Sequence, residues 1–77
     1  MDEVLQEISR IVREELGSPR TPRPSDDLLA DLQLDSVAVL TLVVGLEDRF
    51  RVVLEEEDAA RVRTVQELAA LVVSRKC

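Results

Sequence analysis

The feature of this sequence that is best placed for covalent chemistry is a serine hydroxyl at the start of an apolar segment. Ser36 follows Asp35 within the run LQLDSVAVL, residues 32–40. An Asp is favoured at a helix N-cap, where its carboxylate accepts a hydrogen bond from an unpaired backbone N–H. Ser36 would then occupy the first turn, where free amides and the helix dipole stabilise an anion such as a phosphate ester. These two residues alone still favour an ordinary helix start, because both types are common there.

The other residue types exclude most catalytic and metal-binding arrangements. The chain has no His and one Cys, Cys77, so we expect no zinc site, no Ser–His or Cys–His pair and no internal disulfide. Four consecutive carboxylates at residues 55–58 are typical of solvated surface charge rather than of paired acid–base catalysis. The sequence therefore predicts no catalytic residues and no metal ligands.

Length and composition predict one small helical domain over residues 1–77. Apolar residues make up 45% of the chain, with Phe50 as the single aromatic and two glycines, which favours aliphatic helix packing over a sheet with tight hairpins. The net charge of −6 would repel a nucleic-acid backbone, so we expect no nucleic-acid partner. Four arginines are local exceptions that we interpret as solvated surface: Arg20, Arg23, Arg49 and Arg51.

The sequence also predicts a cytoplasmic, monomeric protein that does not associate with membranes. Residues 1–4 are acidic and lack the basic and apolar regions of a signal peptide. The longest apolar run, from Val37 to Leu46, is interrupted by Thr41 and Gly45 and is too short to span a bilayer. We therefore expect no membrane partner and a reducing compartment.

Helical periodicity predicts the two outer elements of a bundle. Apolar residues recur at spacings of three and four from Asp2 to Leu16, and Gly17 supplies a stop for this amphipathic helix. Thr64 and Glu67 form a capping box, because each side chain can cap a backbone amide of the other. The sequence thus predicts a final helix that begins just after Thr64.

A proline-rich loop and a short helix connect these elements. All three prolines lie within residues 17–25, where fixed φ angles and missing N–H groups exclude helix. Ser25 is expected to cap a short turn over residues 26–31, which would direct three leucines into the core. Carboxylates followed by alanines predict a short helix within Leu54–Arg61, with an acid-rich first turn that suits the helix dipole. The three leucines are Leu28, Leu29 and Leu32.

The segment from Val37 to Phe50 predicts a second long helix that is apolar nearly all round in its first half. Since a helix has one buried face, its apolar side chains cannot all reach the core. We expect four of them to be buried: Leu42, Val43, Leu46 and Phe50. We expect four side chains to lie partly in solvent beside Ser36: Val37, Ala38, Thr41 and Val44. Such a patch is typical of a docking surface, and a bundle that wraps this helix on several sides is the alternative.

From about Asp27 to Val73, the order of these residues resembles the acyl carrier protein family. The resemblance rests on the leucines of the turn, on the triplet Asp35-Ser36-Val37 and on the residues TVQEL at 64–68. It also rests on anchors at the expected spacings downstream of Ser36: Leu42, Val43, Leu46, Glu47 and Phe50. It implies an all-α four-helix bundle, with three longer helices, one short helix and a long loop between helices 1 and 2.

The resemblance implies that Ser36 is the attachment point of 4′-phosphopantetheine, transferred from coenzyme A by a phosphopantetheinyl transferase. It also implies that Asp35 orients Ser36 and that the arm carries acyl, aminoacyl or peptidyl groups as thioesters, so that the protein is not an enzyme. Its partners would be the transferase and the enzymes that load and tailor the cargo. They would dock on Val37, Ala38, Leu40, Thr41 and Val44. A cargo chain folded into the bundle would be lined by Leu46, Phe50, Leu54, Val62 and Leu68.

The chain departs from carriers of primary fatty-acid synthesis near Ser36. Those carriers usually have Gly at the position of Gln33, Leu at that of Val37, and acidic residues early in the second helix, where this chain has Ala38 and Thr41. Loss of early carboxylates weakens salt-bridge docking, so apolar contacts must carry more of the recognition. We therefore expect a discrete carrier of a polyketide, nonribosomal-peptide or aminoacyl pathway. The alternatives are a fatty-acid carrier and a helical interaction module without a prosthetic group.

Overall fold

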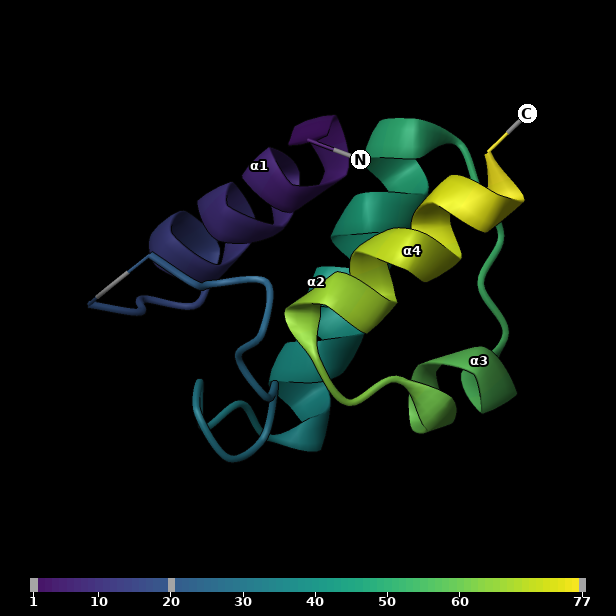
Figure 1. The fold of residues 1–77 in the computed structure, drawn as a ribbon. Helices are drawn as coiled ribbons and strands as arrows, with labels where there is room; N and C mark the ends of the chain where they lie inside the picture. Colours follow the sequence, from purple (N-terminus) through teal and green to yellow (C-terminus); the bar gives the residue numbers. More distant parts are fainter. Residues whose placement is uncertain (1, 20, 77) are drawn as a thin grey trace.

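Helices supply all the regular secondary structure in this computed structural model, which describes residues 2–19 and 21–76. Their order is α1 (Asp2–Arg10), the π-helical segment η1 (Ile11–Glu15), α2 (Ser36–Phe50), α3 (Glu56–Arg61) and α4 (Val65–Arg75). The helices α1, α2 and α4 lie against one another, and the short helix α3 lies at the edge of the bundle, below α4 in this view (Figure 1). The predicted all-α four-helix bundle with a long first loop is confirmed.

The first helix is amphipathic as predicted, but its last turn is π-helical. Val4 and Ile8 of α1 are buried, and so are Ile11 and Val12 of η1. The N–H of Leu16 donates to the carbonyl of Ile11, five residues earlier, at 3.0 Å, which is the pattern of a π-helix. Beyond this turn the helix ends at Gly17, as predicted. Gly17 has a φ of 73°, a conformation that residues with a Cβ avoid.

The turn before α2 is capped by Asp27, so the expectation that Ser25 caps it is wrong. Asp27 Oδ1 accepts hydrogen bonds from the N–H groups of Leu29 and Ala30, at 2.9 and 2.8 Å. These bonds hold the pKa of the Asp27 carboxyl below its ordinary value. A backbone bridge between Asp27 and Thr64 fixes the start of the turn against the start of α4, which places Asp27 rather than Ser25 at its first position.

The three leucines of this region do not all enter the core. Leu28 is buried, Leu32 is half-buried and Leu29 is exposed over 62% of its surface. Leu28 and Leu29 are adjacent in a tight turn, so their side chains leave the backbone in different directions and only one can face the bundle. The prediction is therefore right for Leu28, partly right for Leu32, which packs against the core, and wrong for Leu29.

The core is aliphatic, and α2 contributes to it through one face. Leu42, Val43 and Leu46 are buried as predicted, whereas Phe50 is only half-buried. Its ring lies 5.3 Å from the Arg49 guanidinium carbon and 5.2 Å from Lys76 Nζ, so cations cover the part of the ring outside the core. The buried apolar residues are Val4, Ile8, Ile11, Val12, Leu28, Leu34, Leu42, Val43, Leu46, Val52, Leu54, Val65, Leu68, Ala69 and Val72.

Capping boxes begin the two C-terminal helices. Thr64 Oγ1 accepts from the N–H of Glu67 at 3.1 Å, and Glu67 accepts in return from the N–H of Thr64, as predicted. Backbone N–H groups of Arg63 and Thr64 hold the pKa of Glu67 below its ordinary value. Helix α3 buries no residue of its own, and an ion pair of 2.9 Å joins its Asp58 to Arg75 of α4.

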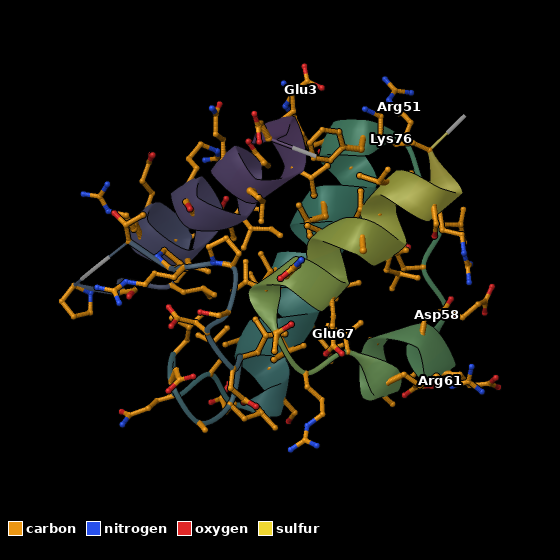
Figure 2. All side chains as sticks on the ribbon, in the orientation of Figure 1. Glu3, Arg51, Asp58, Arg61, Glu67 and Lys76 are labelled. Carbon is orange, nitrogen blue, oxygen red and sulfur yellow. The ribbon has the colours of Figure 1, made fainter. Side chains whose placement is uncertain are left out.

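Charged side chains such as Arg51 and Arg61 point away from the bundle (Figure 2). Among the described residues, no helix is long and apolar enough to cross a membrane. The expectations about Arg20 and Cys77 concern positions outside the residues that the structure describes.

Candidate functional site

Ser36 is the first residue of α2, and it is exposed. The chain that leads to it is anchored, because Leu34 is buried and its N–H donates to the carbonyl of Leu28 at 3.0 Å. Gln33, just before, adopts a left-handed conformation with φ of 56°. The sharp bend at Gln33 and the anchor at Leu34 therefore fix the backbone while Ser36 stays outside the bundle.

Asp35 is the N-cap of α2, which confirms the predicted cap. Its Oδ1 accepts a hydrogen bond of 2.7 Å from the N–H of Ala38, and its carbonyl accepts one of 2.9 Å from the N–H of Val39. The N–H groups of Ser36 and Val37 have no acceptor among the residues that the structure describes. Two backbone donors are thus free beside the serine hydroxyl.

The start of α2 fits a phosphate ester. Two free N–H groups and the dipole of a 15-residue helix favour negative charge at this end. The hydrogen bond that Asp35 accepts from the Ala38 N–H keeps the Asp35 carboxylate in the capping position. A phosphodiester on Ser36 would be stabilised by about 0.3–1 kcal/mol through the helix dipole at an exposed site.

The side chains expected to form a docking surface lie on the outer face of α2. Val37, Leu40 and Val44 are exposed over 69%, 52% and 59% of their surface. Thr41 is also exposed, and Ala38 is half-buried. The bundle therefore does not cover this side of α2. The five residues all lie in α2, the helix that begins with Ser36.

A hollow of about 640 Å³ lies beside these side chains, between the first helix and α2. We call it the α1–α2 groove. On α2 it is lined by Val37, Leu40, Thr41, Val44, Gly45, Asp48 and Arg49, and on α1 and η1 by Glu7, Arg10 and Glu15.

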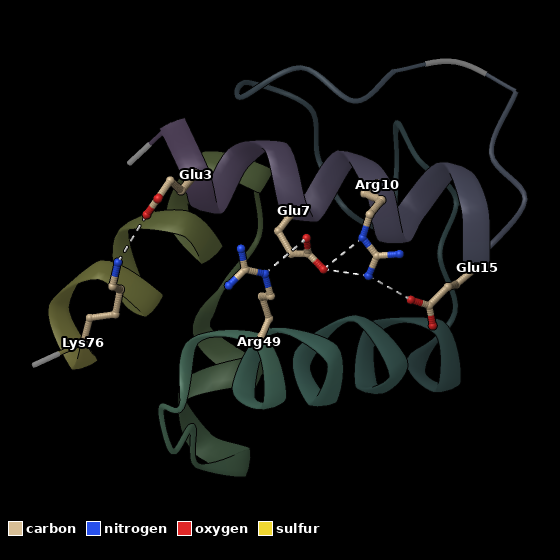
Figure 3. Close-up of polar contacts among 6 residues, drawn as sticks. All are labelled: Glu3, Glu7, Arg10, Glu15, Arg49 and Lys76. Carbon is tan, nitrogen blue, oxygen red and sulfur yellow. Dashed lines mark hydrogen bonds and ion pairs between the residues drawn. The ribbon is translucent and has the colours of Figure 1, made fainter.

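Ion pairs line the α1 side of the groove (Figure 3). Arg10 Nη2 lies 2.6 Å from Glu7 Oε2 and 3.3 Å from Glu15 Oε2, while Arg49 Nε of α2 lies 3.9 Å from Glu7 Oε1. The hydrogen bond from Arg10 lowers the pKa of Glu7 below its ordinary value. Only the i,i+3 spacing of Glu7 and Arg10 signalled part of this network, because the pair with Arg49 joins residues far apart in sequence.

The residues expected to line a folded cargo chain form packed core. Leu46, Leu54 and Leu68 are buried, and Phe50 and Val62 are half-buried. They pack against the main cluster of the bundle, so the sequence expectation identified core residues. A role for them in holding cargo stays a prediction.

Comparisons with known proteins connect this geometry to a family. The family described as "Phosphopantetheine attachment site" matches residues 6–72. An acyl carrier protein of Myxococcus xanthus is 34% identical over 67 residues, which cover 86% of this chain and 85% of the relative. An acyl carrier protein of Kineococcus radiotolerans is 35% identical over 71 residues, which cover 91% of this chain and 88% of the relative. The crystal structure of an acyl carrier protein from Thermotoga maritima has a TM-score of 0.85 at 25% identity, covering 96% of this chain and 87% of that one.

Together with the helical bundle and the exposed serine at a helix start, these matches define the class of the protein as a carrier domain rather than a catalyst. The match over residues 6–72 and relatives above 30% identity establish that the chain belongs to the acyl carrier protein family. Its prosthetic group is 4′-phosphopantetheine, and proteins of this family work with phosphopantetheinyl transferases and biosynthetic enzymes.

Proposed function

We propose that Ser36 carries the 4′-phosphopantetheine and that the arm holds acyl, aminoacyl or peptidyl thioesters in a specialised biosynthetic pathway. The observation that supports the attachment residue is an exposed hydroxyl at the start of a 15-residue helix. Two backbone N–H groups beside it have no acceptor among the described residues, so an added phosphate meets donors and the positive end of the helix dipole.

Attachment requires an external catalyst and coenzyme A. The Ser36 oxygen forms a bond to the phosphorus that bears the pantetheine. The bond from that phosphorus to the bridging oxygen breaks, 3′,5′-ADP leaves, and the serine proton passes to the transferase. The role of this chain is to present the Ser36 hydroxyl to the transferase. The hydrogen bond from the Ala38 N–H to the Asp35 carboxylate stabilises the first turn of α2 and so keeps the hydroxyl at the end of the helix. When bound, the arm supplies a thiol that carries the cargo as a thioester.

The transferase and the enzymes that load and tailor the cargo are proposed to dock on the outer face of α2. This face presents the exposed aliphatic side chains of Val37, Leu40 and Val44. No charged residue occurs in α2 before Glu47, so the first half of this helix offers no salt bridge and its apolar contacts dominate recognition. This absence of early carboxylates supports a polyketide, nonribosomal-peptide or aminoacyl pathway over primary fatty-acid synthesis.

Intact-mass measurement tests the attachment residue. The chain is incubated with coenzyme A and a broad-specificity phosphopantetheinyl transferase, and we expect a gain of one phosphopantetheine unit. Ser36→Ala should abolish the gain, while Ser25→Ala, which removes another exposed serine, should keep it. No gain in the unaltered chain would favour a helical interaction module without a prosthetic group, and a gain in Ser36→Ala would place the attachment elsewhere.

The cargo is identified by capturing the loaded chain from its native host and measuring the mass of the thioester. An aminoacyl, peptidyl or polyketide group would support the specialised pathway. A series of saturated fatty acyl chains would show that the chain serves fatty-acid synthesis instead.

A further inference from the structure

The α1–α2 groove begins one residue beyond Ser36. Its lining on α2 recurs at residues 37, 40, 41, 44, 45, 48 and 49, which are spacings of three and four. Residues at these spacings form a continuous stripe along one side of a helix. The groove therefore leads from the attachment residue along α2 as far as Arg49.

The length of this stripe matches a phosphopantetheine arm. Twelve steps from Val37 to Arg49 at about 1.5 Å per residue give roughly 18 Å. The phosphate, pantoyl, β-alanyl and cysteamine units together correspond to about five extended residues, or roughly 17 Å at ~3.4 Å each. An arm fixed at Ser36 can thus follow the stripe over its whole length.

The polarity of the groove also matches the arm beyond its phosphate, where methyl and methylene groups alternate with neutral amides. Val37, Leu40 and Val44 supply apolar contacts in its first two turns. Thr41 donates its hydroxyl to the Val37 carbonyl at 3.0 Å, so its oxygen lone pairs are available to accept from an amide N–H. Gly45 adds no side chain where α2 approaches η1, and a Cβ there would lie 2.8 Å from Ile11 Cδ1.

Of the five charged residues that line the groove in the described part of the chain, four are paired with one another, and the fifth, Asp48, is exposed. Glu7 bridges Arg10 and Arg49, and Arg10 also pairs with Glu15 (Figure 3). A charged partner segment would have to compete with these pairs, whereas the part of the arm beyond its phosphate is uncharged and can lie over the apolar stripe without disturbing them. The internal pairing therefore favours an occupant that is uncharged along the groove, as the arm is beyond its phosphate.

We propose that, when no enzyme is bound, the phosphopantetheine arm on Ser36 lies in the α1–α2 groove. This inference rests on the proposed attachment at Ser36. The arm covers Val37, Leu40 and Val44, so that a docking enzyme displaces it and gains the thioester and the apolar surface together. Between encounters, the groove shelters the arm from solvent.

Nuclear magnetic resonance of the unmodified and modified chains tests this, with modification first verified by mass. We expect shifts of the Leu40 and Val44 methyl signals and of the Gly45 amide on modification. We also expect nuclear Overhauser effects between the arm's geminal methyl groups and Leu40 and Val44. The methyl signals of Val53, exposed over 71% of its surface and outside the groove, should not move.

A matched pair of variants tests the contacts. Val44→Gln should abolish the Overhauser effects between the arm and the groove and return the Leu40 methyl shifts to their unmodified values. Val53→Gln makes the same chemical change at an exposed valine and should leave these effects intact. Circular dichroism confirms that both variants keep their helical content before the comparison is made.

The outcomes separate this inference from the proposed function. No mass gain would contradict attachment at Ser36. A normal mass gain with shifts confined to residues 35–38 would show an arm free in solvent and would overturn the groove as its site. Concentration-dependent shifts of Leu40 and Val44 in the unmodified chain would assign the groove to a second copy of the protein and would also overturn it.

Discussion

Removal of the Asp35 cap should destabilise the protein by a measurable amount. Asp35→Ala deletes the oxygen that accepts the 2.7 Å hydrogen bond from the Ala38 N–H at the start of α2. Such a replacement at an N-cap costs about 1 kcal/mol, within a range of roughly 0.5–2 kcal/mol. α2 supplies Leu42, Val43 and Leu46 to the core, so its first turn is coupled to the folding of the whole bundle.

Thermal and urea unfolding would detect this loss. At about 2.1 cal/mol/K per residue, the unfolding entropy of 77 residues is roughly 160 cal/mol/K, so 1 kcal/mol lowers Tm by about 6 °C. With a urea m-value of about 1 kcal/mol/M for a chain this small, the midpoint should fall by about 1 M. Circular dichroism at 222 nm is a suitable signal, because helices supply the regular structure of residues 2–19 and 21–76.

Asp35→Asn separates capping from charge. Asn is as good an N-cap as Asp, so this variant should keep Tm within about 2 °C of the unaltered chain. The rate of phosphopantetheine attachment to each variant, followed by mass, then tests whether the carboxylate also orients Ser36. An unchanged Tm in Asp35→Ala would refute the capping argument. Equal losses in both variants would assign the stabilisation to the charge rather than to the hydrogen bond.

Three further predictions follow from exposure, backbone strain and ionisation. Val44→Glu should preserve helical content but slow handover of cargo to partner enzymes, and a collapse of the circular dichroism signal would show that Val44 is core. Gln33→Gly should relieve a left-handed strain of about 1–2 kcal/mol, offset by about 0.4–1 kcal/mol of chain entropy, giving a slightly higher Tm; a lower Tm would contradict this. The pKa values of Glu7, Asp27 and Glu67 are lowered by folding, so their contribution to the free energy of unfolding is complete above the unfolded values of 4.5 and 3.8. It should be lost as pH falls through the lower folded values, and a urea midpoint that rises from pH 5 to pH 3 would contradict this assignment.

Local interactions made much of the fold predictable from the sequence. The Asp35 cap, the Thr64–Glu67 capping box and the glycine stop after the first helix each involve residues within four positions of one another. The partly exposed face of α2 was also predictable, because one helix cannot bury apolar residues on every side. Ser36 was singled out by the same local logic. Its role required the family resemblance, because Asp-Ser begins many ordinary helices.

The burial of individual residues in connecting segments was less predictable. Leu28 and Leu29 are adjacent residues of the same type. The backbone bridge between Asp27 and Thr64 nevertheless turns Leu28 into the core and leaves Leu29 in solvent. Phe50 was expected in the core, but Arg49 and Lys76 cover its exposed part. In both cases a contact from another part of the bundle contributes: Thr64 for the leucines and Lys76 for Phe50.

By itself, the sequence determined where α2 and α4 begin and which hydroxyl stands at the start of α2, since neighbours along the chain form these caps. Tertiary structure alone decided that a groove runs from this hydroxyl beside α2. The groove exists because the first helix lies against α2, with Gly45 against Ile11 and Arg49 beside Glu7. Those residues are more than 30 positions apart, and only packing of the whole bundle brings their side chains together.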